Sequence, residues 1–201
     1  MSADSDPTRR QLLHGALAAS GLGLTGYPDA TFAQGELAPT PQCHDGDAPT
    51  EPQIEGPFYK PRSPQRADLT EPGTKARLVE VSGFVLTRSC APVPRVLVDL
   101  WHADERGDYD NRGFRYRGHL FTDAMGAYRF RTIVPALYPG RTRHYHVKVL
   151  STGRQLLTTQ LYFPDEPMNA RDDFFSPALL MRIANAGETT SARFDFVLDA
   201  R

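Results

Sequence analysis

The chain has 201 residues, the size of one domain with a full hydrophobic core. Its 23 basic and 24 acidic residues nearly cancel, and no basic patch stands out, so nucleic acid is not an expected partner. No apolar run reaches membrane-spanning length, and we expect no membrane partner for the processed protein.

The N-terminus has the features of an export leader. TRRQLL at residues 8–13 resembles the twin-arginine signal, a short Gly-diluted apolar stretch follows it, and Thr31-Phe32-Ala33 offers a cleavage site. The alternative is a short amphipathic helix that packs on the domain. The order of the three features favours export, so we predict a twin-arginine signal peptide at residues 1–33 and a periplasmic or secreted protein.

Residues 34–75 are rich in Pro, Gly and Asp, which predicts an extended arm with little regular structure. The arm contains Cys43, and the other cysteine of the chain is Cys90. In an oxidising compartment these two could form a disulfide. Two unrelated thiols are the alternative, and the sequence leaves both open.

From residue 76 to residue 201 the sequence changes to short segments with alternating or continuous apolar residues, which are typical of strands. The predicted strands are 77–86, 95–102, 127–134, 144–150, 155–163 and 192–198. Only Ser176–Ala184, which opens with Ser-Pro, suggests a helix. Many short strands with at most one or two short helices predict an all-β fold, an antiparallel β-sandwich.

The predicted strand 144–150 begins with His-Tyr-His. Residues i and i+2 of a strand point to the same face, so His144 and His146 project together, with Cα atoms about 6.6 Å apart. Two imidazoles at this spacing can bind one metal ion, although two exposed histidines are the commoner outcome. Further ligands must come from elsewhere, and two loop tyrosines, Tyr109 and Tyr138, precede the pair.

These residues belong to a longer series of motifs. In chain order they are EGPFY (55–59), W-x-A-D-x-x-G-x-Y (101–109), T-D-x-x-G-x-Y-x-F-x-T-I-x-P (122–135), Tyr-Pro (138–139), R-x-x-H-x-H (141–146) and TTQLYF (158–163). With all of them in this order, the chain resembles the intradiol ring-cleavage dioxygenases, which include protocatechuate 3,4-dioxygenase and catechol 1,2-dioxygenase. The resemblance extends from EGPFY to the last predicted strand.

The resemblance implies one non-haem Fe(III) ion per chain, bound by Tyr109, Tyr138, His144 and His146. Phenolate oxygen and imidazole nitrogen are donors that suit a hard cation. It also implies that Tyr138 acts as a base, and that Arg141 and Gln160 stabilise negative charge on the ring. The implied reaction consumes O₂ and cleaves a small catecholic substrate between its two hydroxyl-bearing carbons, giving a cis,cis-muconic acid.

Two departures from the family pattern bear on the substrate. Gly140 follows Tyr-Pro where the family often has Trp, and Thr142-Arg143 replaces the Pro-Ala of R-P-A-H-I-H. We therefore expect a smaller and more polar pocket wall than in protocatechuate 3,4-dioxygenase. The chain also lacks the long helical N-terminal region of catechol 1,2-dioxygenases. All four implied ligands lie on one chain, so a partner subunit is not required, and a homo-oligomer is left open.

Two other functions stay open on the sequence. An Fe(II) extradiol-type oxygenase would use His144 and His146 with a carboxylate such as Asp123, and a metal-free secreted β-sandwich would bind carbohydrate or protein. Neither accounts for the order Tyr, Tyr, Arg-x-x-His-x-His, so the intradiol hypothesis is favoured. Outside this order, we interpret His102 and His119 as structural or exposed, and Asp123 as a turn residue.

Overall fold

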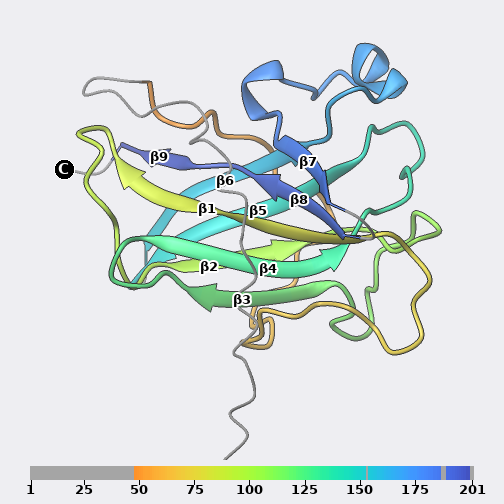
Figure 1. Ribbon diagram of the computed structural model, residues 1–201, viewed down its shortest axis with the longest axis horizontal. Coiled ribbons are helices and arrows are strands. Elements are labelled where there is room, and N and C mark those ends of the chain that lie inside the picture. Colours follow the sequence, from red (N-terminus) through yellow and green to blue (C-terminus); the bar gives the residue numbers. More distant parts are fainter. Residues whose placement is uncertain (1–47, 153, 187–188, 200–201) are drawn as a thin grey trace, which may run out of the picture. The chain divides into compact units, whose positions relative to one another are not determined.

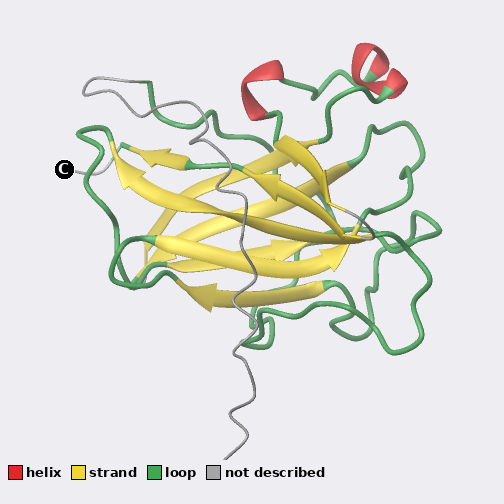
Figure 2. Ribbon diagram, viewed as in Figure 1, coloured by secondary structure: helices red, strands yellow, loops and turns green. Residues whose placement is uncertain are grey.

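Nine strands in two sheets make up the part of the chain that the computed structural model describes, residues 48–152, 154–186 and 189–199 (Figure 1). The strands are β1 (Leu78–Thr87), β2 (Leu97–Trp101), β3 (Arg117–Phe121), β4 (Ala127–Ile133), β5 (His144–Ser151), β6 (Arg154–Tyr162), β7 (Arg182–Ala186), β8 (Thr189–Arg193) and β9 (Phe196–Leu198). Two 3-10 helices, η1 (Pro167–Arg171) and η2 (Pro177–Leu179), lie between β6 and β7. The predicted all-β sandwich with at most two short helices is confirmed (Figure 2).

The two sheets differ in strand direction. One has the order β4-β1-β8-β7, with β9 also beside β1, and the other has the order β3-β2-β5-β6. The second sheet is antiparallel throughout, as predicted. In the first sheet β1 runs antiparallel to β4 but parallel to β8 and β9, so this sheet is mixed.

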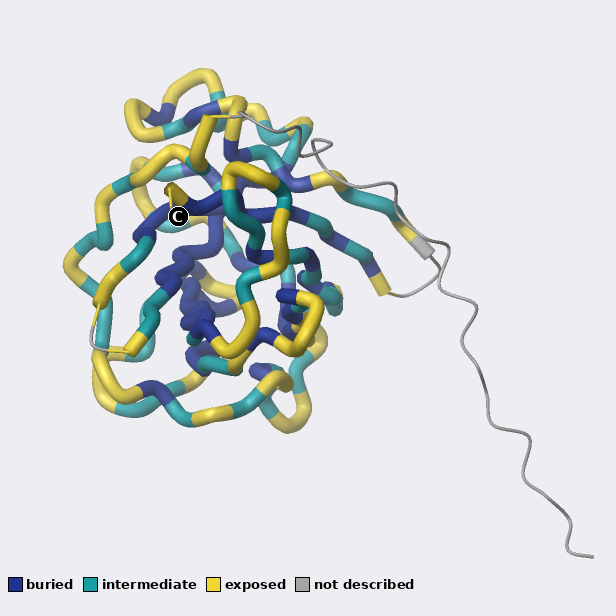
Figure 3. Tube along the Cα trace, turned by 90° about the vertical axis from the view of Figure 1, so that its left-hand side faces the viewer, coloured by how far each residue is buried: buried dark blue, intermediate teal, exposed yellow. Residues whose placement is uncertain are grey.

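The core lies between the sheets and is filled by alternate residues of the strands. Buried and half-buried positions alternate along β1, as expected for a strand with one face in the core. Tyr145, Val147 and Val149 of β5 belong to the same core cluster. Figure 3 shows the buried positions concentrated in the interior and the exposed ones along the periphery. Because His144 and His146 alternate with these core residues, their side chains lie on the outer face of the four-stranded sheet.

The arm has no helix and no strand in its described part, residues 48–75, in agreement with the sequence. It is nevertheless tied to the sheets by backbone hydrogen bonds. The N–H of Gln53 donates to β6, that of Arg66 donates to β3 and that of Leu69 donates to β4, at 2.8, 3.0 and 2.8 Å. The arm therefore protects edge groups of three strands that would otherwise be unpaired.

Two features of the fold differ from the prediction. The strands β3 and β7 were not expected, because their sequences RGHLF and RIANA contain few β-branched or aromatic residues, and the predicted strand 192–198 is divided between the end of β8 and β9. The predicted helix at Ser176–Ala184 is wrong in extent: it is reduced to the single turn of η2, and Arg182 already belongs to β7. A short apolar run such as ALLMRIA fits a helix or a strand. Here its last residues, from Arg182 onward, pair with the neighbouring β8 and therefore form a strand.

Several predictions concern residues outside the described part of the chain. These are the signal peptide at 1–33, the first part of the arm at 34–47, and Cys43. Cys90 is disulfide-bonded, but Cys43 lies outside the described residues, so the pairing of the two stays a prediction. Among the described residues, no helix is long and apolar enough to cross a membrane.

Candidate metal centre

The two histidines of β5 lie in the middle of a row of polar and aromatic side chains on the outer face of the sheet. In the strand register His146 is opposite Trp101 of β2 on one side and Gln160 of β6 on the other. His144 and His146 are only 4% and 3% exposed. Two imidazoles this deeply buried need hydrogen-bond or metal partners for their nitrogen atoms. The alternative of two exposed histidines on a strand therefore does not apply.

Tyr109 reaches the same face from the loop after β2, and the sequence fixes the shape of this loop. One carboxylate oxygen of Asp104 accepts hydrogen bonds from two backbone N–H groups of the loop, at 2.8 and 3.0 Å. Gly107 has a φ of +92°, and a Cβ at this position would lie 2.3 Å from the carbonyl oxygen of Leu137. Only glycine permits this close approach of the two loops. The Asp and Gly of the W-x-A-D-x-x-G-x-Y motif therefore direct Tyr109 toward the histidines.

Three of the predicted ligand atoms converge on one point. The Oη of Tyr109 lies 3.2 Å from Nε2 of His144 and 3.1 Å from Nε2 of His146, and the two Nε2 atoms are 3.1 Å apart. At the metal–nitrogen distance of about 2.1 Å that imidazole ligands adopt, neighbouring ligand atoms at right angles lie about 3 Å apart. The spacing of the three atoms therefore fits a single metal ion between them.

Tyr138 lies beside this triangle, at the end of the loop that approaches Gly107. Its ring packs edge-on against the ring of Tyr109, with centroids 5.7 Å apart, and against that of Phe58, at 5.4 Å. The side chain is half-buried, so one part of it faces solvent. The structure thus brings all four predicted ligands together, three by their donor atoms and Tyr138 by its ring.

The protonation of the site suits metal binding. The Nδ1–H of His144 donates to the carbonyl oxygen of Thr142 at 2.6 Å, which leaves the lone pair of Nε2 free. Burial is the main cause that lowers the pKa of His144 to about 4 and the pKa of His146 well below its ordinary value. Both imidazoles are therefore neutral at neutral pH. Burial also raises the pKa of Tyr109, so its phenol keeps its proton until a cation replaces it.

The donor atoms near the two histidines also bear on the choice between an extradiol-type site, which needs a carboxylate ligand, and an intradiol-type site, which needs phenolate ligands. Within the described ranges no three His, Cys, Asp or Glu side chains form a group that could hold a metal, so a carboxylate does not complete the pair His144 and His146. Asp123, the carboxylate considered for an extradiol site, accepts hydrogen bonds from the backbone N–H groups of Met125 and Ala127 in the turn before β4. The oxygen that lies at the two imidazoles is the phenol oxygen of Tyr109, and a phenolate donor favours a hard, highly charged cation.

Arg141 and Gln160 contact each other at the edge of the site. The Nη2 of Arg141 donates to Oε1 of Gln160 at 2.6 Å, and Nε2 of Gln160 donates to the carbonyl oxygen of Ile54 in the arm at 3.0 Å. The guanidinium also lies over the ring of Phe174, 4.7 Å from its centroid. Two residues that lie 19 positions apart in the sequence are thus joined by a hydrogen bond, and Gln160 is opposite His146 in the strand register.

Residues that were not expected at the site come from the arm and from β3. The ring of Phe58 stacks on that of Tyr109, with centroids 4.5 Å apart and planes 15° apart. Arg117, which is 1% exposed, donates to the carbonyl oxygens of Phe58 at 2.5 Å and of Asp110 at 3.1 Å. Phe58 lies within the EGPFY motif, so a signal for it existed. Arg117 has no such signal, because a buried arginine looks like a surface arginine in the sequence.

Among the described residues, the histidines interpreted as structural form hydrogen bonds with other partners than the three converging donor atoms. His102 is buried, with Nε2 2.6 Å from the hydroxyl of Thr132 and Nδ1 2.7 Å from the carbonyl oxygen of Ala103. Nδ1 of His119 lies 3.0 Å from the hydroxyl of Ser63 in the arm. Both imidazoles thus take part in local hydrogen bonds.

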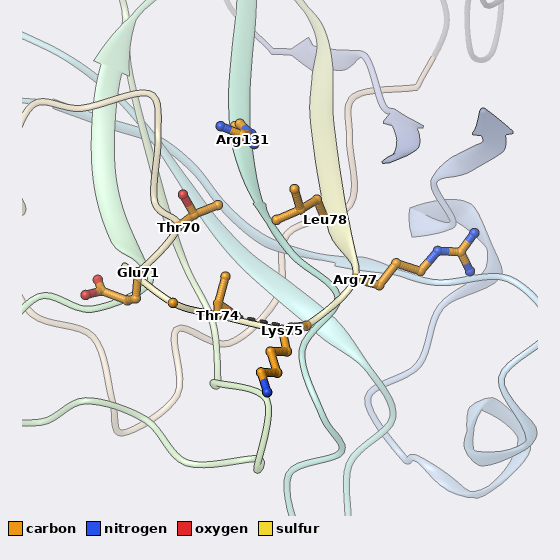
Figure 4. A pocket seen from close by; sticks show the side chains of 9 residues that line it. Thr70, Glu71, Thr74, Lys75, Arg77, Leu78 and Arg131 are labelled. Atoms are coloured by element: carbon orange, nitrogen blue, oxygen red, sulfur yellow. Dashed lines mark hydrogen bonds between the residues drawn. The ribbon is translucent and has the colours of Figure 1, made fainter. Parts of the chain in front are cut away.

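A separate hollow of about 530 Å³ lies in the surface between residues 70–78 and Arg131 (Figure 4). None of the six predicted site residues lines it. Its cationic side chains Lys75, Arg77 and Arg131 point in different directions in this view, so they do not converge on a common ligand.

Comparison with known proteins decides between the remaining classes. A family model described as "Dioxygenase" matches residues 54–200. The chain belongs to the intradiol dioxygenase family. The predicted family is thereby confirmed, and a metal-free binding module is not the class to which the chain belongs.

Individual relatives of this family differ in size and similarity. The protocatechuate 3,4-dioxygenase beta chain of Burkholderia cepacia is 31% identical over 67% of this chain and 72% of that protein. Hydroxyquinol 1,2-dioxygenase of Rhodococcus opacus is 28% identical over 62% of this chain, and the chain spans about half the length of that protein.

Solved structures of the family show the same fold. The dioxygenase domain of a dioxygenase carbohydrate-binding protein fusion from the cellulolytic bacterium Streptomyces sp. SirexAA-E is 53% identical. The match covers 77% of this chain and all of that domain, with a TM-score of 0.74. The 3-chlorocatechol 1,2-dioxygenase of Rhodococcus opacus 1CP is 26% identical, with a TM-score of 0.68 over 77% of this chain and 73% of that chain.

Proposed function

We propose that the protein is an Fe(III) intradiol dioxygenase that cleaves a small catechol between its two hydroxyl-bearing carbons. The observation that carries the proposal is the convergence of Tyr109 Oη with Nε2 of His144 and of His146, beside Tyr138. Names of the relatives support the reaction class, since they are protocatechuate, hydroxyquinol and catechol dioxygenases.

Tyr109, Tyr138, His144 and His146 would hold the iron. Bound there, the ferric ion would hold the catechol through its two oxygens and make the ring reactive toward O₂. Two phenolates balance most of its charge, which favours the ferric over the ferrous state.

The protein residues around the iron have distinct tasks in this proposal. Tyr138, which is half-buried, would accept a proton from a catechol hydroxyl at its Oη. Arg141 and Gln160, which are joined by a hydrogen bond, would stabilise negative charge that develops on the ring. Phe58 and the arm cover the buried side of Tyr109 and exclude water from it.

The proposed substrate is a small, plant-derived catechol met outside the cytoplasm, and the product is a cis,cis-muconic acid. Three features support it. The twin-arginine motif of residues 8–13 favours export. The 53% identical domain comes from a cellulolytic bacterium and is fused to a carbohydrate-binding protein. A Cβ added to the exposed Gly140 would have no atom within 4 Å, which agrees with an open pocket wall after Tyr138.

The test is product analysis with labelled oxygen. The iron-loaded protein is offered catechol, protocatechuate and hydroxyquinol under ¹⁸O₂, and products are identified by mass spectrometry. A muconic-type diacid that contains both labelled atoms supports the proposal. A semialdehyde would instead place cleavage outside the diol and favour the extradiol alternative. Strict dependence on the carboxylate of protocatechuate would keep the reaction but contradict the open pocket.

A further inference from the structure

Asp172 is a buried carboxylate behind the predicted site, and no sequence motif pointed to it. Its side chain is 0% exposed. Its two oxygens lie 3.0 and 2.9 Å from Nε of Arg141. The carboxylate also accepts the backbone N–H of Thr142 at 2.8 Å and that of Phe174 at 2.9 Å. One carboxylate therefore joins the segment that leads into β5 to the loop after η1.

These contacts fix the direction of the Arg141 side chain. With Nε bound to Asp172, Nη2 is directed to Oε1 of Gln160, and the guanidinium plane lies over Phe174. The side chain of Arg141 is 15% exposed, so one side of the guanidinium stays accessible. A free arginine side chain samples many rotamers, and anchoring it before substrate arrives removes this entropic cost from the reaction.

We propose that Asp172 is a positioning residue, which holds the guanidinium of Arg141 against Gln160 and toward the catechol ring. This inference rests on the proposed function. The carboxylate acts through Arg141 and does not touch the substrate itself. It also keeps Phe174 in place, because the backbone N–H of this residue is one of its donors. A purely structural role would act on stability and iron content and would not depend on the presence of Arg141.

The experiment compares Asp172→Asn with Asp173→Asn, the same change at the exposed neighbouring residue. Arg141→Gln and the double variant Asp172→Asn/Arg141→Gln complete a double-mutant cycle. We expect Asp172→Asn to lower kcat about 10- to 100-fold, and to cause less than about a threefold further loss in the Arg141→Gln background. Asp173→Asn should keep the wild-type kcat.

Two further measurements do not depend on turnover. Because the four ligands are untouched, Asp172→Asn should keep the iron content and the visible tyrosinate-to-iron band of the wild type. In an anaerobic titration with 4-nitrocatechol, its Kd should change less than its kcat does, since the anchored guanidinium acts on charge that develops during the reaction.

The outcomes separate the two proposals. An active wild type, with equal kcat for Asp172→Asn and Asp173→Asn, overturns the role of Asp172 alone. The same follows if the losses of the two single variants multiply in the double variant, or if Asp172→Asn loses its iron. An iron-loaded wild type that cleaves no catechol overturns the proposed function, and the positioning role with it.

Discussion

At the scale of single residues, it is the contacts of a side chain, and not its residue type, that distinguish a site residue from the others. His144 is one of six histidines, and what distinguishes it is the contact of its Nε2 with Tyr109 and His146. His119 lies on the same sheet, one strand beyond β2, and its Nδ1 contacts only Ser63 among the hydrogen bonds of the described residues. The two histidines therefore make a matched pair for a test.

His144→Ala should lose most of the bound iron, while His119→Ala should keep it. The first change removes one of three donor atoms that converge within 3.2 Å of one another, and the second removes none. Iron per chain is measured by metal analysis after reconstitution of both variants with ferric ion. Equal iron contents in the two variants would contradict the proposed centre.

The two tyrosines should respond differently to removal of the hydroxyl group. Tyr109 is held by contacts with both imidazoles, so Tyr109→Phe should lower the affinity for iron strongly. Tyr138 contacts the site through its ring, which phenylalanine retains, so Tyr138→Phe should keep part of the iron but deprotonate the catechol slowly. Iron content and single-turnover rates separate the two effects. A Tyr138→Phe variant with the wild-type turnover rate would show that Tyr138 is not the base.

At the scale of elements, the site depends on two loops that meet at a glycine. Gly107 has a positive φ, and its Cβ-free backbone lies against the carbonyl group of Leu137, so the loop of Tyr109 approaches the loop of Tyr138. Gly73 has a similar φ of +79°, but a Cβ there would meet nothing within 4 Å. An alanine would thus have an unfavourable positive φ at either position. Only at position 107 would its Cβ also clash with a neighbouring atom.

Gly107→Ala should therefore destabilise the protein by more than Gly73→Ala and should also lower its iron content. The strained φ costs each variant about 1 kcal/mol, and the 2.3 Å approach to Leu137 adds to this at Gly107 alone. Urea denaturation measures the free energy of unfolding, and metal analysis measures the iron. If the two variants matched in both quantities, the contact between the loops would not matter for the site.

The elements also show what the sequence could predict. The strands with clear alternation, such as β1 and β4, were found, and the motifs named residues that the structure brings together, because local patterns encode both. β3 and the buried Arg117 were missed, since their environment is created by residues of the arm and of β2 that lie far away in the chain. The apolar run at Ser176–Ala184 was misread as a helix for a different reason: a short apolar run fits either element, and only its last residues pair with β8 in a hairpin.

At the scale of the whole molecule, buried ionisable groups link folding to pH. Asp99 is 4% exposed beneath the arm, where the hydroxyl of Ser63 donates to it at 2.8 Å. Burial is the main cause that raises its pKa from 3.8 to about 6. His102 shows the opposite effect, since burial lowers its pKa from 6.5 to about 4. Over the same pH range the two groups therefore change the free energy of unfolding in opposite directions.

Asp99→Asn isolates one of these contributions. The folded state holds a proton on Asp99 up to about pH 6, whereas the unfolded chain releases it near 3.8, so this group makes the folded protein less stable as pH rises between these values. The wild type loses about 3 kcal/mol through Asp99 over this range, and the asparagine variant does not. The free energy of unfolding of Asp99→Asn relative to wild type should thus increase as pH rises from about 4 to about 7.

The measurement is a series of urea denaturation curves across this range for the wild type, Asp99→Asn and the exposed control Asp173→Asn. His102 contributes equally to all three proteins and cancels in the differences. Asp173→Asn controls for the loss of one carboxylate at an exposed position. A flat or falling difference for Asp99→Asn would mean that Tyr59, Lys148 and the arm compensate the buried charge of Asp99 fully.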